Sequence, residues 1–182
     1  MSLQNTPEKF GSLTKLLHWT IFILFMVQYF LVYRREYFPK TSPEKLQYML
    51  LHKSFGVCVL ALALTMLIWG RIGKRPAMPI NMSGLEKFAA KSIHLLLYVV
   101  MFVMPITGML MSQFAGYPVS VFGWFDMPSF FSKNESLAHF FKETHEISSF
   151  IIMGIVGIHV FAAFFHHYVR KDNVLTRMLP FR

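Results

Sequence analysis

The chain has 182 residues, of which 54% are hydrophobic and only 15% charged, and its formal net charge is +9. A soluble domain of this size cannot bury so much apolar surface, so the composition excludes a soluble globular enzyme and a disordered chain. The single cysteine excludes an internal disulfide, and in so apolar a chain the basic excess is expected at membrane surfaces, with no nucleic-acid partner.

Four runs without Asp, Glu, Lys or Arg follow one another along the chain, at residues 16–33, 54–70, 92–125 and 147–169. A helix crosses a bilayer with about 20 apolar residues, and none of the runs alternates apolar with polar residues as a barrel strand does. The sequence therefore predicts an all-α fold, an antiparallel transmembrane four-helix bundle that forms one domain over residues 1–182. We expect its helices at about residues 15–34, 46–71, 88–114 and 139–169.

Basic residues indicate how the bundle is oriented. The two terminal segments and the loop between the second and third spans carry eleven Lys and Arg residues, against seven on the opposite side. Because cytoplasmic segments are enriched in Lys and Arg, both termini are expected in the cytoplasm. Seven cations on the outer side are still more than orientation alone favours.

Histidines lie inside or at the ends of the spans, where ionisable side chains are costly and usually functional. His145 and His159 are fourteen residues apart, so they share one helix face and stand about 21 Å apart along its axis. By depth in the membrane, His18 matches His159 on the cytoplasmic side. His52 in turn matches His145 on the outer side.

Two histidines that face each other in a bundle core suit both axial positions of a haem iron. No Cys-x-x-Cys-His motif is present, so the sequence predicts two haems of type b, held by ligation alone. Two alternatives stay open. Zinc would take three or four ligands at one depth, and the histidines could instead make purely structural contacts between helices.

The segments around these histidines resemble the bacterial cytochrome b-561 family, the stand-alone di-haem membrane cytochromes with four helices. The matching segments are LLHW at His18, LHKSFG at His52, FKETHE at His145, GIHVFAAFFHHY from Gly157 to Tyr168, and KDNVLTRMLP near the end. The resemblance covers nearly the whole chain and implies the same two pairs of ligands. It also implies a multi-pass protein of the bacterial inner membrane.

Within that family, the superoxide-oxidising members are the most similar. The resemblance thus implies an oxidoreductase that oxidises superoxide to oxygen at the outer face and passes the electrons through two b haems to ubiquinone. A basic funnel would steer the anion toward the outer haem. Its candidate residues are Lys53, Lys142, Arg35 and Lys40.

The alternative function is a b-haem membrane anchor subunit, which relays electrons between a partner dehydrogenase and the quinone pool. About fifteen residues precede the first helix and about thirteen follow the last, too few for a docking domain. We therefore expect no obligatory protein partner. The surroundings that the protein needs are those of the lipid bilayer.

Further candidate residues lie elsewhere in and around the spans. Arg71, at the inner end of the second span, is a candidate partner of a haem propionate. His94, His166 and His167 are candidates for a quinone site or a haem edge, with a polar contact between helices or an interfacial position as the alternative. Pro105 is expected to kink the third helix, and Gly108 to admit a partner helix or a haem edge. The aromatic connection over residues 116–136 is expected to form an interfacial belt, with a lid over a site as the alternative.

Overall fold

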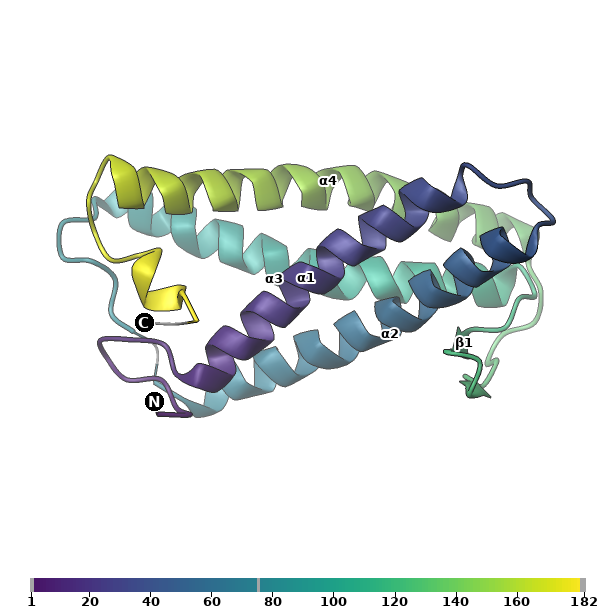
Figure 1. Cartoon of the computed structure of the whole chain (residues 1–182), viewed down its shortest axis with the longest axis horizontal. Coiled ribbons are helices and arrows are strands. Elements are labelled where there is room, and N and C mark those ends of the chain that lie inside the picture. The colour runs from purple at the N-terminus through teal and green to yellow at the C-terminus, as the bar shows by residue number, and fades with distance from the viewer. Residues whose placement is uncertain (1, 75, 181–182) are drawn as a thin grey trace.

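The computed structural model describes residues 2–74 and 76–180 and consists mainly of four long helices (Figure 1). These are α1 (Ser12–Arg35), α2 (Pro43–Ile72), α3 (Gly84–Phe114) and α4 (Glu135–Tyr168). The short elements are β1 (Ser120–Val121), β2 (Phe125–Asp126) and the 3-10 helix η1 (Thr176–Met178). All four helices are long and apolar enough to cross a membrane, which confirms the predicted all-α transmembrane bundle.

All four helices begin three or four residues before the starts predicted from the apolar runs, and for α2, α3 and α4 the reason is a polar capping residue. The side chains of Ser42, Ser83 and Asn134 each accept a hydrogen bond from a backbone N–H of the first turn, at 3.0–3.2 Å. Such caps satisfy donors that the helix itself leaves free. Despite Pro105 in its interior, α3 continues as one helix from Gly84 to Phe114.

The bundle is built from two helical hairpins. Neighbours in the chain pack along each other, α1 with α2 and α3 with α4, and α2 contacts α3 over a smaller area. The start of α1 and the end of α4 lie at the same end of the bundle, together with the loop between α2 and α3 (Figure 1). We call this the termini end, and we call the opposite end, with the α1–α2 loop and the α3–α4 connection, the hairpin end.

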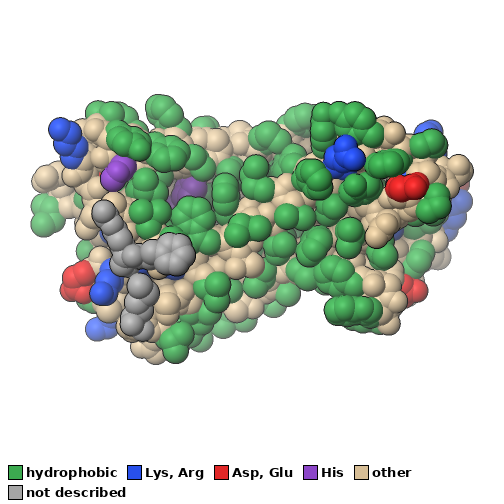
Figure 2. All heavy atoms as spheres, viewed as in Figure 1, with side chains coloured by type: hydrophobic (Ala, Val, Ile, Leu, Met, Phe, Trp, Pro, Cys, Tyr) green, Lys and Arg blue, Asp and Glu red, His purple; other side chains and the backbone are tan. Residues whose placement is uncertain are grey.

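The helices bury little of their apolar surface against each other. Val100, Ile152 and Ile155 form a small core between α3 and α4, while Phe150 and Phe161 remain 77% and 70% exposed. Figure 2 shows hydrophobic side chains along the middle of the molecule and charged side chains toward its two ends. This distribution fits a protein whose sides face lipid.

Candidate cofactor-binding site

Two pairs of histidines face each other inside the bundle, one at each end. At the termini end, the ring centroids of His18 in α1 and His159 in α4 are 6.2 Å apart. At the hairpin end, the centroids of His52 in α2 and His145 in α4 are also 6.2 Å apart. The structure thus brings these four residues together in the pairs that the depth argument predicts, and each pair joins the α1–α2 hairpin to α4.

The equal separations are informative about what the pairs can hold. A metal–nitrogen bond of about 2 Å plus a ring radius of about 1 Å, counted on both sides, separates the centroids of two axial imidazoles by about 6 Å. If the two imidazoles of each pair were only hydrogen-bonded to each other, nothing would require their centroids to have the same separation at both ends of the bundle. The spacing therefore fits one iron atom between the rings of each pair, as in a bis-histidine b haem.

The ring nitrogens support this fit. Within the described residues, the Nδ1 atoms of His18 and His52 are buried and have no hydrogen-bond partner. A purely structural buried histidine normally has its polar atoms satisfied, because an unmet one costs about 1–3 kcal/mol. An unpaired ring nitrogen is free to bind a metal, and such a bond would remove this cost.

His145 has a different and better-defined environment. Its Nδ1 lies 2.9 Å from the carbonyl oxygen of Met104 and 3.3 Å from the hydroxyl of Thr107. Because a carbonyl oxygen can only accept, Nδ1 carries the proton in this contact, which leaves Nε2 free to bind a metal. The structure thus fixes both the orientation and the tautomer of this ring.

Gly108 provides the space for that orientation. A Cβ atom at this position would lie 3.1 Å from Cε1 and 3.3 Å from Nδ1 of His145. The sequence predicted that Gly108 admits a partner helix or a haem edge, and what it admits in the structure is the imidazole of α4. A narrow cavity beside the pair is lined by both His52 and His145, and also by Gly56, Gly108 and Val119.

A third histidine touches the pair at the termini end. The ring of His94 in α3 stands edge-on to His159, with centroids 5.3 Å apart and an interplanar angle of 73°. Nowhere in residues 2–74 and 76–180 do three or more His, Cys, Asp or Glu side chains form a group that could bind a metal ion. The donor set thus fits the two axial positions of a haem better than zinc.

Two of the four predicted funnel residues lie near the pair at the hairpin end. The guanidinium of Arg35 acts electrostatically on both His52 and His145. It also donates to the sulfur of Met49 in α2. Lys53 follows His52 directly, and its Nζ donates to the carbonyl of Pro118 at 3.0 Å.

The other two funnel candidates occupy more exposed positions. Lys142 is 59% exposed and pairs with Glu146 on the same helix, at 3.6 Å. Lys40 is exposed in the loop between α1 and α2. Within the predicted set, Arg35 and Lys53 are therefore the cations that the fold holds against the site.

The aromatic connection between α3 and α4 is an ordered cover that also exposes aromatic rings. Ser54 is fully buried, and its hydroxyl accepts from the backbone N–H of Phe122 at 2.8 Å, which fixes the connection against α2. Val119 is 2% exposed and lines the cavity beside the histidine pair, whereas Trp124 and Phe130 are 80% and 74% exposed. The segment thus covers the cavity beside the pair and leaves aromatic rings exposed, and the interfacial belt stays a prediction.

At the termini end, the chain after α4 folds back beside His18, which the sequence did not predict. The indole of Trp19 donates to the carbonyl of Met178 at 2.9 Å, and Nζ of the buried Lys15 donates to that of Leu179 at 2.8 Å. Arg71, the predicted propionate partner, lies exposed in the last turn of α2.

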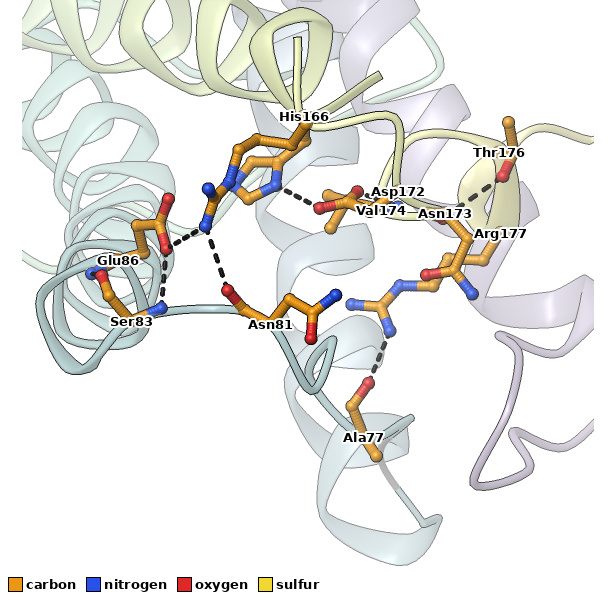
Figure 3. A network of polar contacts seen from close by, with 11 residues as sticks. Ala77, Asn81, Ser83, Glu86, His166, Asp172, Asn173, Val174, Thr176 and Arg177 are labelled. Carbon is orange, nitrogen blue, oxygen red and sulfur yellow. Dashed lines mark hydrogen bonds and ion pairs between the residues drawn. The ribbon is translucent and has the colours of Figure 1, made fainter. Parts of the chain in front are cut away.

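The two last predicted histidines differ in environment although they are adjacent. His166 is buried and contacts the carboxylate of Asp172, with Nδ1 and Oδ2 2.6 Å apart (Figure 3). His167 is half-buried, and its ring lies against Tyr168 with centroids 4.8 Å apart. Nearby, burial lowers the pKa of Arg177 from its ordinary value, while the Asp172 carboxylate opposes that shift.

Residues 9–181 match the sequence profile of prokaryotic cytochrome b561. The chain belongs to this family. It is 32% identical over 186 residues to cytochrome b561 homolog 2 of Escherichia coli (strain K12), and the match covers 98% of this chain and 95% of that protein. It is 29% identical to cytochrome b561 homolog 1 of the same organism, over 96% of this chain and 99% of the other.

A third relative is a probable superoxide oxidase, CybB, of Yersinia pestis. It is 29% identical over 174 residues, which are 95% of this chain and 97% of that protein. The resemblance predicted from the sequence is thus confirmed at the level of the family. This cytochrome b561 is a multi-pass bacterial membrane protein of an electron-transfer family that carries b-type haem.

Proposed function

We propose that the protein is a membrane oxidoreductase that takes electrons from superoxide at the hairpin end and delivers them to ubiquinone. The observation that carries this proposal is the pair of equal 6.2 Å separations, one toward each end of α4. A single α4 helix contributes one histidine to each pair, so both redox positions are held on one rigid element. The superoxide oxidase relative supports the choice of donor.

In this proposal His18 and His159 hold one b haem, and His52 and His145 hold a second. Bound haems would supply one-electron carriers at two depths of the membrane. The protein's own contribution at the hairpin end is the Met104 carbonyl, which holds the proton of His145 on Nδ1 and so leaves Nε2 unprotonated. Contacts of this kind from outside the ligand set increase the basicity of the ligand and fix its orientation.

Superoxide is an anion that gives up one electron to become oxygen. Arg35 and Lys53 place positive charge beside the pair at the hairpin end. The carbonyl of Pro118 takes only one of the three N–H groups of Lys53, so the other two remain available as hydrogen-bond donors. The exposed Lys142 and Lys40 add to the long-range field that raises the encounter rate. The hairpin end faces outward in this proposal, and both termini lie in the cytoplasm of a protein of the inner membrane.

The overall reaction is balanced by two superoxide anions for each quinone. Two superoxides release two oxygens and two electrons, and ubiquinone takes the two electrons with two protons to give the quinol. His94 stands edge-on to His159 and is the side chain best placed to act between the termini-end pair and a quinone in the surrounding lipid. Arg71 and His167, nearer the surface, remain candidates for the haem propionates and the quinone.

The experiment that tests the proposal uses the purified, oxidised protein in detergent. A superoxide flux is applied and the haem absorbance near the b-type α band is followed, with and without ubiquinone. We expect reduction that added quinone reverses and that superoxide dismutase abolishes. Visible haem that superoxide does not reduce would instead favour the alternative, an anchor subunit that receives electrons from a partner dehydrogenase.

A further inference from the structure

A second buried polar cluster lies at the termini end, outside the paired histidines. His166 is 8% exposed and donates from Nδ1 to Oδ2 of Asp172 at 2.6 Å; the two side chains are 10% and 20% exposed (Figure 3). His166 follows His159 by seven residues, which places it on nearly the same face of α4 and about 10 Å nearer the end of the bundle. The cluster is thus in line with the termini-end pair.

The chain after α4 is shaped to bring Asp172 to this position. Lys171 has a φ of +52°, in the left-handed region, and this turn returns the chain toward the helix end. The backbone N–H of Asp172 then donates to the carbonyl of His166 at 3.1 Å. Its second carboxylate oxygen, Oδ1, accepts from the N–H of Val174 at 2.9 Å. Both carboxylate oxygens are therefore held, and Oδ2 is fixed on the histidine.

Asp172 also borders open space. It lines a cavity of about 780 Å³ between the chain after α4 and the loop between α2 and α3, with Asn81, Asn173 and Arg177 among the other lining residues. A cavity of this size has room for many water molecules. The carboxylate therefore stands between a buried imidazole and a cavity that water can enter at the termini end.

The charges around the pair leave Asp172 as the acid that faces His166. From α3, Glu86 acts electrostatically on the same histidine, but its carboxylate is engaged by Arg170 at 3.0 Å. Arg177 is near enough to Asp172 to act on it electrostatically, while its Nη1 donates to the carbonyl of Ala77 at 2.6 Å. No other described residue forms an ion pair with His166 or Asp172.

We propose that His166 and Asp172 form a proton relay that connects the termini-end cavity to quinone reduction, an inference that rests on the proposed function. Oxidation of superoxide releases no proton, so both protons of the quinol must come from water. Paired with the Asp172 carboxylate, His166 can carry a proton on both ring nitrogens. In that imidazolium form Nε2 gives its proton to the quinone oxygen, and a neutral imidazole with its proton on Nδ1 remains. Water in the cavity then restores that proton, so each transfer is balanced by uptake from the termini side.

The test begins with protein in which the haems are already reduced, so that it does not depend on superoxide. Reduced protein is mixed anaerobically with ubiquinone, which needs two protons, or with ferricyanide, which accepts electrons alone, and haem oxidation is followed by stopped flow. For D172N and H166Q we expect oxidation by ubiquinone to slow at least tenfold and oxidation by ferricyanide to change less than twofold. The matched controls are D126N and H139Q, which alter an exposed acid and an exposed histidine.

Two further readouts separate proton transfer from a structural effect. A pH-indicator dye should show that proton uptake slows together with quinone reduction, and added imidazole should restore at least part of the rate of H166A. The haem content of D172N and H166Q, measured by absorbance, should match that of the wild-type protein. If H166Q loses haem, the test rests on D172N alone. Unchanged quinone reduction in D172N, or equal slowing with both acceptors, would overturn the relay. Failure of superoxide to reduce the haems would overturn only the proposed donor.

Discussion

The imidazole of His145 donates its Nδ1 proton to the main-chain carbonyl of Met104, 2.9 Å away in the neighbouring helix. Because the Cβ of a larger residue at position 108 would stand only 3.1 Å from this ring, the same helix α3 both anchors the histidine and leaves room for it. The hairpin-end site is therefore defined by α3 as much as by the helices that carry the two histidines.

The first prediction concerns the pairing itself. Replacing His52 or His145 with Ala should remove the hairpin-end haem and leave the termini-end haem in place, because each pair shares no residue with the other. A pyridine haemochrome assay relative to protein should fall from two haems to one, with a single remaining redox wave. If either variant keeps both haems, the assignment of these ligands is wrong.

A second prediction isolates the space at Gly108. Glycine to alanine in a helix ordinarily adds about 1 kcal/mol of stability, so a loss here must come from the clash with His145. We expect G108A to reduce occupancy of the hairpin-end haem or to shift its low-spin electron paramagnetic resonance signal, while the termini-end signal stays constant.

The matched control for this variant is G84A, since a Cβ at Gly84 has no neighbour within 4 Å. G84A should leave both haem signals unchanged. A G108A spectrum identical to that of the wild-type protein would show that the His145 ring is not constrained at this contact.

A third prediction tests how the chain after α4 is held at the termini end. The change W19F removes the hydrogen bond from the indole to the Met178 carbonyl but keeps an aromatic ring beside His18. One such bond contributes about 1 kcal/mol, so the open form of this segment should become about fivefold more populated. Trypsin cleavage after Arg177 should accelerate by a similar factor, whereas W124F, at a ring that is 80% exposed, should cleave at the wild-type rate.

The sequence was sufficient for the bundle and for the partners of the four histidines, because span length and a fourteen-residue spacing on one helix depend on local geometry. It could not reveal that Ser54 fixes the backbone of Phe122 or that Lys15 reaches Leu179, since both contacts join segments far apart in the chain. The contact of Asp172 with His166 differs, because it joins residues that are close together in the chain. Asp172 lies six residues after His166, but only the left-handed turn at Lys171 directs it back to that ring.

The last prediction concerns charge at the hairpin end. The changes R35Q and K53Q each remove one positive charge near the pair of His52 and His145, so the rate of haem reduction by superoxide should fall severalfold at low ionic strength. The difference from the wild-type protein should shrink as salt is raised, because the Debye length falls from about 30 Å at 0.01 M to about 8 Å at 0.15 M. K9Q removes an exposed charge at the termini end and should leave the rate unchanged. Stopped-flow measurement over a series of salt concentrations checks both statements, and equal salt dependence in all three variants would show that these two cations do not guide the anion.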